Sequence, residues 1–252
     1  MSAEGEFAGL VAAVTGGGAG IGLAIVEELS ARGARVAALD LDPGAVGHHV
    51  LGIRCDVRDD ASVRAAVGEV VRVFGGLDVL VNNAGISAVG TVEDNDDDEW
   101  ARVLDVNVIG MARMTRAALP CLRASKHAAV VNLCSIAAHN GLPQRALYSA
   151  SKGAVLGLTY AMATDHVGEG IRVNCVSPGT VHTGFVDRML QRFDDPVAER
   201  TALDARQATG RMVTPAEVAG AVAYLASPLS ASTTGTALEV DGGFGHVRVR
   251  RS

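Results

Sequence analysis

The chain has 252 residues, enough for one α/β domain with a sizeable core but too few for two full ones. Its formal net charge is −6 and no basic stripe crosses its body, so no nucleic-acid partner is expected. No uncharged apolar stretch reaches about 18 residues, and the N-terminal segment is acidic, unlike a secretory signal. We therefore expect a cytoplasmic protein with no membrane association.

Apolar runs and helical patterns alternate along the chain. Strands are predicted, in chain order, at residues 10–14, 35–39, 50–55, 79–81, 129–133, 172–176 and 237–240. Helices are predicted between them at residues 21–31, 61–74, 99–123, 148–167 and 215–225. This alternation implies parallel strands joined by right-handed crossovers. The predicted fold is α/β, with residues 1–252 forming one domain: a doubly wound, Rossmann-like parallel sheet of about seven strands with helices on both faces.

Three further segments have simple interpretations. Acidic residues 94–99 precede a predicted helix and suit its first turn better than a calcium site. Residues 183–214 follow the sixth strand and would lie over the carboxyl ends of the strands, so we expect a substrate lid there. The basic tail, residues 247–252, is expected to be solvated.

The cysteines predict neither a disulfide framework nor a metal site. No Cys-x-x-Cys pair or metal-ligand spacing occurs, and most of the four lie in or beside apolar runs. We expect free, largely buried thiols in a reducing compartment. The four are Cys55, Cys121, Cys134 and Cys175.

A glycine-rich loop follows the first predicted strand. It does not contain the strict Gly-x-Gly-x-x-Gly fingerprint, but Gly16-x-x-x-Gly20-x-Gly22 meets the same need: a tight turn and a helix N-terminus that point backbone amides at a pyrophosphate. A nucleoside-triphosphate P-loop is excluded, because no Gly-Lys-Ser or Gly-Lys-Thr follows. Asp40 ends the second strand, where a carboxylate can bind both adenosine ribose hydroxyls and repel a 2′-phosphate.

Four polar residues form a candidate catalytic set. Tyr148 and Lys152 are four apart on a predicted helix and so share a face. A neighbouring ammonium favours the ionised form of a phenol, which suits proton transfer at a carbinol, although helical pairs of this kind also occur by chance. Ser135 follows a strand and could polarise a substrate oxygen or simply cap a turn. Asn107, in a predicted helix, could be functional or solvated.

Taken together, these motifs resemble the short-chain dehydrogenase/reductases of the single-domain type. Further pieces in the order and spacing of that family are Asp56-Val57, Asn82-Asn83-Ala84-Gly85 and Pro178-Gly179. The resemblance extends from Leu10 to Phe244. It implies an oxidoreductase that moves a hydride between NAD and a secondary alcohol or ketone.

The resemblance also implies residue roles. Tyr148 would be the acid/base, Lys152 would assist it and hold the nicotinamide ribose, Ser135 would polarise the substrate oxygen, and Asn107 would hold a water that links Lys152 to a proton relay. The NAD-binding positions implied are Gly16, Gly18, Gly20, Ile21, Asp40, Leu41, Asp56, Val57, Asn83, Ala84, Gly85, Tyr148, Lys152, Pro178, Gly179, Val181 and Thr183.

A closer similarity concerns the substrate. The segments around Pro178-Gly179 and Arg206-Gln207 are similar to those of cytosolic-type 3-hydroxybutyrate dehydrogenases and 2-keto-3-deoxy-fuconate dehydrogenases. His182 departs from this pattern, since those enzymes commonly carry an aspartate there. The similarity implies a small carboxylate-bearing substrate, such as a hydroxy acid or sugar acid. The substrate residues implied are Ser135, Tyr148, Arg145, Arg188 and Arg206.

Assembly and two rival functions complete the expectations. The family is often tetrameric, and the apolar outer positions of the helix predicted at 99–123 fit an intersubunit face, so a homotetramer is expected. One rival is a 3-oxoacyl-carrier-protein reductase, which usually takes NADPH; Asp40 argues against it. The other is a non-catalytic NAD-binding regulator; the intact Ser-Tyr-Lys set argues against that.

Overall fold

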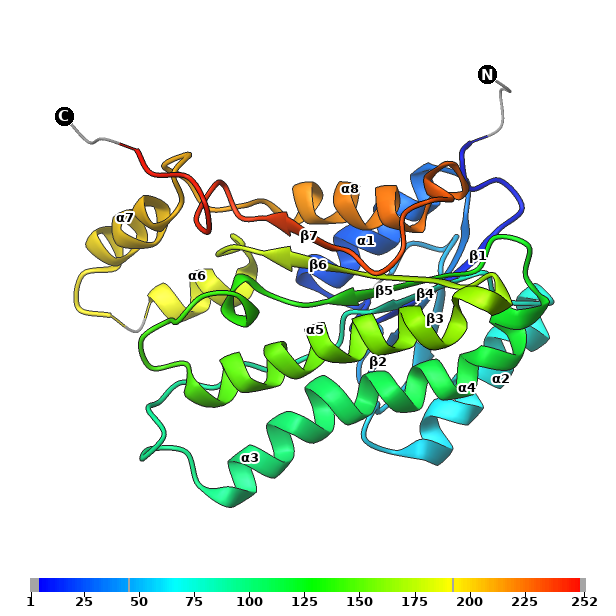
Figure 1. Cartoon of the computed structure of the whole chain (residues 1–252), viewed down its shortest axis with the longest axis horizontal. Coiled ribbons are helices and arrows are strands. Elements are labelled where there is room, and N and C mark those ends of the chain that lie inside the picture. Colours follow the sequence, from blue (N-terminus) through cyan, green and yellow to red (C-terminus); the bar gives the residue numbers. More distant parts are fainter. Residues whose placement is uncertain (1–4, 45, 192, 250–252) are drawn as a thin grey trace.

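The computed structural model describes residues 5–249 except residues 45 and 192. Within this part of the chain one parallel sheet forms, with the strand order β3-β2-β1-β4-β5-β6-β7 (Figure 1). The strands are β1 (Val11–Thr15), β2 (Arg35–Asp40), β3 (Leu51–Arg54), β4 (Val79–Asn82), β5 (Ala129–Leu133), β6 (Arg172–Pro178) and β7 (Ala237–Val240). The predicted single-domain, doubly wound sheet is confirmed, and each strand lies within about one residue of its predicted bounds at most ends.

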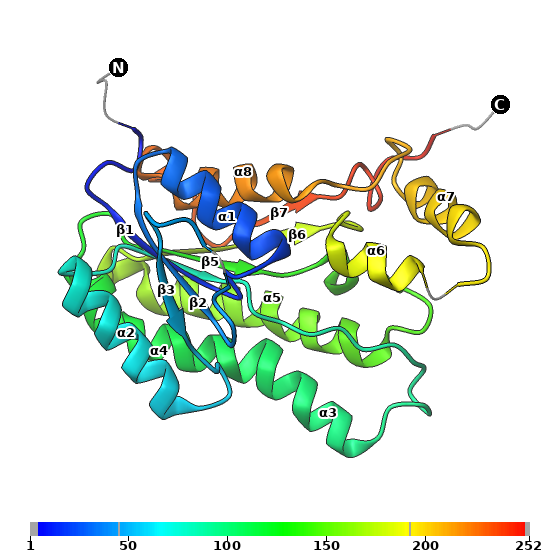
Figure 2. The ribbon, with the colours of Figure 1, turned by 180° about the vertical axis from the view of Figure 1, so that it is seen from behind.

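Helices cover both faces of the sheet (Figures 1 and 2). One face carries α1 (Gly20–Ala31) and α8 (Pro215–Ala226). The other carries α2 (Asp60–Phe74), α4 (Gly110–Ala124) and α5 (Ala146–His166). Three shorter helices, α3 (Asp97–Leu104), α6 (Gly184–Leu190) and α7 (Pro196–Arg206), lie toward one end of the molecule.

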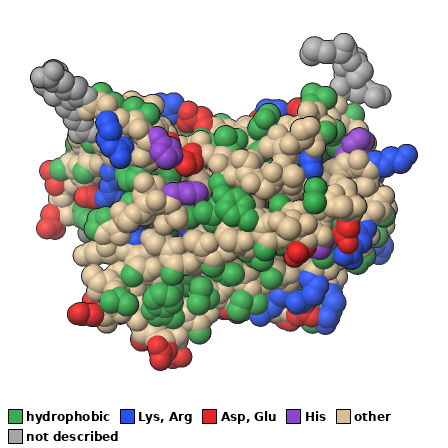
Figure 3. Space-filling model, viewed as in Figure 1, with side chains coloured by type: hydrophobic (Ala, Val, Ile, Leu, Met, Phe, Trp, Pro, Cys, Tyr) green, Lys and Arg blue, Asp and Glu red, His purple; other side chains and the backbone are tan. Residues whose placement is uncertain are grey.

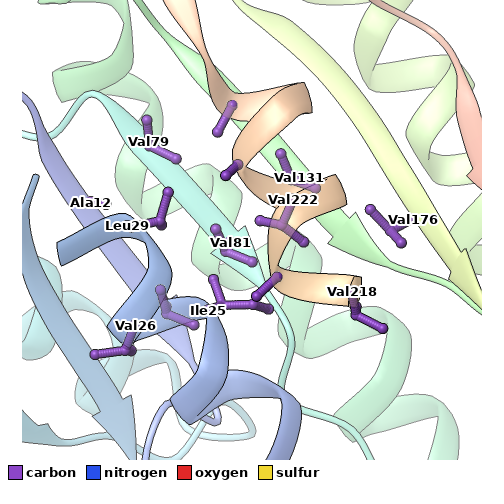
Figure 4. Close-up of a cluster of buried hydrophobic side chains, with 14 of the residues drawn as sticks. Ala12, Ile25, Val26, Leu29, Val79, Val81, Val131, Val176, Val218 and Val222 are labelled. Atoms are coloured by element: carbon purple, nitrogen blue, oxygen red, sulfur yellow. The ribbon is translucent and has the colours of Figure 1, made fainter. Parts of the chain in front are cut away.

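The core consists of two apolar layers separated by the sheet. Successive residues of β1 alternate between them: Ala12 and Val14 pack under α1 and α8, whereas Val11 and Ala13 face α2 and α4. Figure 4 shows the first layer, where Ile25 and Leu29 of α1 meet the strands. Burial on both faces explains why the strands are continuous apolar runs.

A buried polar chain crosses the second layer. Asn82 and Asn132 are register partners on β4 and β5, and the Asn82 amide donates to Asn132 Oδ1 at 2.9 Å. Asn82 also donates to Thr115 Oγ1 on α4, and Asn132 donates to Thr159 Oγ1 on α5. The chain therefore ties two central strands to two helices.

The helix predicted over residues 99–123 is interrupted in the structure. It begins as α3, passes through a π-helical turn at Asp105–Ile109 and continues as α4. The physical reason is Asn107, whose side chain bonds to the backbone of Ile86 instead of facing solvent. The acidic cluster does begin the helix as predicted: the Asp96 carboxylate caps the Glu99 amide at 2.8 Å.

The predicted lid segment contains two helices and is anchored at both ends. It holds α6 and α7, beyond the ends of β6 and β7 in Figure 1. At its base Val181 forms a bridge with Val213, and the His182 amide donates to Val213 O at 2.8 Å. His182 also contacts Asp187 of α6 (2.8 Å) and Arg200 of α7 (3.4 Å), so it links the two helices.

The remaining expectations concern the cysteine thiols, the C-terminal tail and membrane association. All four cysteines are free; Cys121 is partly exposed and the others are buried. The described part of the tail is exposed, as expected; Val247 and Val249 border a hollow of about 150 Å³ beside Ala205 and Ala208. Across residues 5–249, apart from the two gaps, no helix is long and apolar enough to cross a membrane.

Candidate active site

The candidate site lies at the carboxyl edge of the sheet. The strand order reverses between β1 and β4, and a crevice for ligands forms at such a point in doubly wound sheets. The glycine loop follows β1, Ser135 follows β5, and Tyr148 and Lys152 lie on the first turns of α5. The fold thus brings together groups that are up to about 130 residues apart in the chain.

Lys152 is almost completely buried, with 5% of its surface exposed. Its ammonium donates to the carbonyl oxygen of Leu133, the last residue of β5, at 2.8 Å. The same ammonium lies 5.7 Å from the centre of the Tyr148 ring. An ammonium carries three donors, and within the described residues only this one hydrogen bond is made, so two donors remain for a polar ligand.

Ser135 both caps a turn and keeps a donor. Its Oγ accepts a hydrogen bond from the Ala137 amide at 3.1 Å and so begins the 3-10 turn Ile136–Ala138. A hydroxyl has two acceptor sites and one proton, so this bond leaves the proton free to donate to a substrate oxygen. The capping and catalytic interpretations therefore do not exclude one another.

Asn107 is fully buried at the π-helical turn. Its Oδ1 accepts from the Ile86 amide at 2.8 Å, and its Nδ2 donates to Ile86 O at 2.9 Å and to Ser151 Oγ at 3.1 Å. Ser151 in turn donates to Tyr148 O. The Asn107 side chain thus ties the loop after β4 to the catalytic helix. That Asn107 holds a water stays a prediction. Because its side-chain amide is already bonded, the water would bind to the Asn107 backbone.

The glycine loop packs so closely on itself and on the residues after β2 that side chains would not fit at two of its glycines. The Gly18 amide donates to Asp40 Oδ2 at 3.0 Å, which places the carboxylate beside the loop. A Cβ on Gly18 would lie 2.6 Å from Asp42 O, and a Cβ on Gly22 would collide with Gly16 O. The glycine loop at a helix N-terminus, the adjacent carboxylate and the buried ammonium with spare donors fit a dinucleotide.

The loop after β4 is tied to the glycine loop by side-chain bonds. Thr15 Oγ1 accepts from the amides of Asn83 and Ala84, at 2.9 and 3.0 Å. The Asn83 side chain donates to Thr15 O and Gly16 O. Gly85 lies against Asn107, since its Cβ would approach Asn107 Oδ1 to 3.2 Å. Asn83 and its neighbours therefore fix the shape of the crevice.

The other predicted cofactor residues surround this crevice from several elements. Leu41 is half exposed after β2, and Val57 is buried after β3. The Asp56 carboxylate pairs with Arg58 at 2.7 Å, and this hydrogen bonding holds the pKa of Asp56 below its usual value. On the opposite side, Thr183 caps α6 and lies near the glycine loop, because a Cβ on Gly20 would be 3.9 Å from its methyl carbon.

The segment after β6 supplies the remaining predicted contacts. Pro178 ends β6, and Gly179 packs so closely on the end of β7 that a Cβ there would lie 3.0 Å from Asp241 Cα. Val181 is buried at the lid base. These positions follow β6 at the same sheet edge as Ser135.

The three predicted substrate arginines differ in their surroundings. Arg145 is half-buried at the start of α5 and donates to Ser87 Oγ (3.1 Å) and Ala88 O (2.8 Å). Burial lowers the pKa of its guanidinium; Tyr148 opposes this effect, and the positive charge of Arg206 adds to it. Arg145, Tyr148 and Arg206 are therefore electrostatic neighbours. Arg188 is exposed near the end of α6, and no described contact joins it to this group.

Sequence reasoning missed two residues beside the site, Cys134 and His139. Cys134 lies between Leu133 and Ser135, and its Sγ is 3.3 Å from Lys152 O. The neighbouring Cys175 thiol and, more weakly, the charge of Lys152 lower its pKa against the effect of burial, which raises it. His139 Nε2 hydrogen-bonds with Ser177 Oγ at 3.0 Å. No local pattern marks either residue, because both contacts form only when β5, β6 and α5 pack together.

The fold and this site define a nicotinamide-dependent oxidoreductase. A family model described as enoyl-(acyl carrier protein) reductase matches residues 16–245. The 2-(S)-hydroxypropyl-CoM dehydrogenase 3 of Xanthobacter autotrophicus is 41% identical over 92% of this chain and 95% of its own length. The cis-4-hydroxycyclohexanecarboxylate dehydrogenase of Sinomonas cyclohexanicum is 38% identical, over 94% of this chain and 97% of its own.

A solved structure leads to the same family. The ligand-free aldohexose dehydrogenase of Thermoplasma acidophilum superposes with a TM-score of 0.91 at 33% identity, covering 99% of this chain and 98% of that one. The chain therefore belongs to the short-chain dehydrogenase/reductase family. It is an enzyme of the dehydrogenase type that acts on CH–OH groups.

Proposed function

We propose that the enzyme is an NAD-dependent dehydrogenase that interconverts a secondary alcohol and a ketone on a small anionic substrate, such as a hydroxy acid or sugar acid. The observation that carries the anionic part is the position of Arg145 three residues before Tyr148, with the charge of Arg206 acting on it and no carboxylate paired with either arginine among the described residues. The remaining site residues that we assign are those predicted from the sequence.

The chain's own residues prepare the substrate for oxidation. Ser135 donates its free hydroxyl proton to the substrate oxygen, and Tyr148 takes the carbinol proton as general base. The Lys152 charge, held 5.7 Å from the Tyr148 ring, favours the phenolate and offers donors to the cofactor ribose. Nicotinamide supplies the hydride chemistry when bound. Reduction of the ketone uses the same groups in reverse.

Asp40 supports NAD over NADP. Its carboxylate lies beside Gly18, at the end of β2, where the adenosine ribose binds in this fold. One oxygen already accepts the Gly18 amide, and the other accepts the Asp42 amide at 3.2 Å, so the group is held in place. A fixed negative charge there accepts ribose hydroxyl donors and repels a 2′-phosphate.

An anion would relieve an electrostatic conflict between two arginines. Arg145 and Arg206 repel one another, and neither pairs with a carboxylate among the residues that the structure describes. A planar guanidinium matches a carboxylate or related anion well. The name of the Sinomonas relative includes a carboxylate, which is in keeping with this proposal. Arg188 is retained as a third candidate from the lid.

The rival function on this scaffold is reduction of a 3-oxoacyl group on a carrier protein. The family description names an acyl-carrier-protein reductase, so this rival is worth a direct test. We favour the small anionic substrate because Asp40 disfavours NADPH and because residues 183–214, if they form the proposed lid, would limit access to small molecules. We further propose that the enzyme is a cytoplasmic homotetramer.

The test compares acids with their neutral analogues. Purified enzyme is screened with secondary hydroxy acids, sugar acids and the matching methyl esters or amides, following NADH absorbance. We expect KM for the acid to rise at least about tenfold in Arg145→Ala and Arg206→Ala, while KM for the neutral analogue stays unchanged. Exposed Arg54→Ala, far from α5 on β3, is the matched control. Equal turnover of acid and ester by the unchanged enzyme would reject the anionic substrate.

A further inference from the structure

Cys134 occupies the junction between strand β5 and the catalytic serine. Its backbone amide donates to Val176 O on β6 at 2.8 Å, which continues the strand pairing past Leu133. Its side chain is 4% exposed and packs in a small cluster with Met111, Val155 and Cys175. By position alone it would be only a core thiol.

The thiol, however, makes a directed contact with the catalytic helix. Cys134 Sγ lies 3.3 Å from the carbonyl oxygen of Lys152. The ammonium of that same lysine lies 2.8 Å from Leu133 O, the carbonyl just before Cys134. Lys152 is therefore attached to two consecutive residues of one strand end, by its main chain and by the tip of its side chain.

A two-point attachment matters because the lysine stem is flexible. Four methylenes separate the charge from the backbone, and each added bond removes freedom that the ammonium would otherwise have. Ser135 is the next residue after Cys134, so the same contact also fixes the distance between the serine and the lysine backbone. Ser135 and Lys152, which must act on one substrate and one cofactor, are thereby held at a fixed separation.

We propose that Cys134 is a positioning residue: its thiol fastens the main chain of Lys152 to the end of β5, so that Lys152 and Ser135 keep a fixed relation. This inference rests on the proposed roles of Lys152 and Ser135. Donation to a carbonyl requires the protonated thiol, because a thiolate would face the partial negative charge of that oxygen.

Because the acceptor is the Lys152 carbonyl, the proposal can be tested by removing the Cys134 thiol. The Lys152 carbonyl is within an α-helix and can also accept the usual helical hydrogen bond, so removing the thiol does not leave it without any partner. Cys134→Ala should therefore loosen the lysine rather than create a buried unsatisfied group. Cys134→Ser keeps a donor of similar reach.

The experiment measures NADH binding by fluorescence titration, together with thermal unfolding. We expect Cys134→Ala to weaken NADH binding about threefold to tenfold, the value of one net hydrogen bond, and Cys134→Ser to restore it to within about twofold. Lys152→Ala measures how much NADH affinity is lost when the whole lysine side chain is removed. Cys175→Ala is the matched control: an equally buried thiol with no contact to Lys152 O, expected to lower the melting temperature without changing NADH affinity.

Three outcomes would overturn the proposal: unchanged NADH affinity in Cys134→Ala, a serine variant as weak as the alanine variant, or an equal loss in Cys175→Ala. With an acid that the enzyme oxidises, kcat should fall in Cys134→Ala while KM for the acid stays within about twofold, because the arginines are untouched. If no acid is oxidised, the proposed substrate fails, yet the NADH titration still decides the role of Cys134.

Discussion

Asp40 Oδ2 accepts a hydrogen bond from the backbone amide of Gly18 at 3.0 Å. The residue that we assign to cofactor choice therefore also shapes the glycine loop, which we propose binds the pyrophosphate. Gly18 cannot be replaced easily, because a Cβ there would lie 2.6 Å from Asp42 O. Cofactor preference and loop geometry are thus coupled through one contact.

Asp40→Ala should narrow the preference for NAD over NADP by at least about tenfold, because the repulsion of a 2′-phosphate is lost. The affinity for NAD should also fall, since the Gly18 amide loses its acceptor. Titration with both reduced cofactors measures this. Asp42→Ala is the control and should leave the ratio unchanged, because among the described residues the Asp42 carboxylate accepts only the Gly44 amide.

Tyr148→Phe should lower kcat at least about 100-fold while NADH binding stays near that of the unchanged enzyme, because proton transfer loses its donor and acceptor. Stopped-flow or steady-state rates with any substrate found by screening measure the loss. Tyr160→Phe, three turns further along α5 and 44% exposed, is the matched control. A Tyr148→Phe enzyme with a rate near normal would reject the mechanism.

Most of the fold was readable from the sequence, because buried parallel strands leave continuous apolar runs. The error lay in the helix predicted over residues 99–123. Helical periodicity passes through Asn107 unbroken, but the π-helical turn depends on the bonds of Asn107 to Ile86, 21 residues earlier in the chain. Such a partner is invisible to a local pattern. The mid-helix asparagine was the signal that was present.

The sequence can propose site residues where the motif itself carries the chemistry, as for Tyr148 and Lys152, whose ring centre and ammonium the structure places 5.7 Å apart. Cys134 was not predictable in this way, because a thiol beside an apolar strand has the same appearance as any core cysteine. Its contact with Lys152 O exists only when β5 and α5 pack together. The neighbourhood of Arg145 and Arg206 likewise depends on where α7 places the lid.

A homotetramer should be seen by light scattering at micromolar concentration, with a mass near four times the 25.8 kDa chain. Hydrophobic side chains gather over α3 to α5 in Figure 3, and Ile109 and Tyr160 are 46% and 44% exposed. Tyr160→Asp should reduce the mass by placing a charge in an apolar contact. Val197→Asp, 75% exposed on α7, should not. A stable monomer of the unchanged protein contradicts the prediction.

Glu217 should stabilise the protein only when it is ionised. Hydrogen bonds from Arg211 and the Thr214 amide lower its pKa from 4.5 to about 2. Since the folded-state pKa is the lower one, the contribution is complete above pH 4.5 and is lost as the pH falls toward 2. The pair is exposed and screened, so we expect Glu217→Gln to cost only about 0.5–1 kcal/mol at pH 7.

Urea unfolding of the unchanged protein and of Glu217→Gln, at pH 7 and at pH 3, measures this effect. The difference between the two proteins should shrink at pH 3 and in high salt. Glu27→Gln is the control, because the exposed Glu27 carboxylate on α1 makes no ion pair among the described residues. If the difference in unfolding free energy between the two proteins grew on acidification, the predicted direction of the pH dependence would be wrong.

The polar chain through Asn82 and Asn132 has a consequence for strand alignment. Most positions of β4 and β5 are valine, leucine or alanine, which would pack almost equally well after a slip along the sheet. A shift of one residue would turn Asn132 to the opposite face, away from Asn82 and Thr159, and strand its amide in hydrocarbon at a cost of about 1–3 kcal/mol. Apolar burial therefore drives formation of the sheet, whereas the Asn82–Asn132 pair makes a single register of β4 and β5 the stable one.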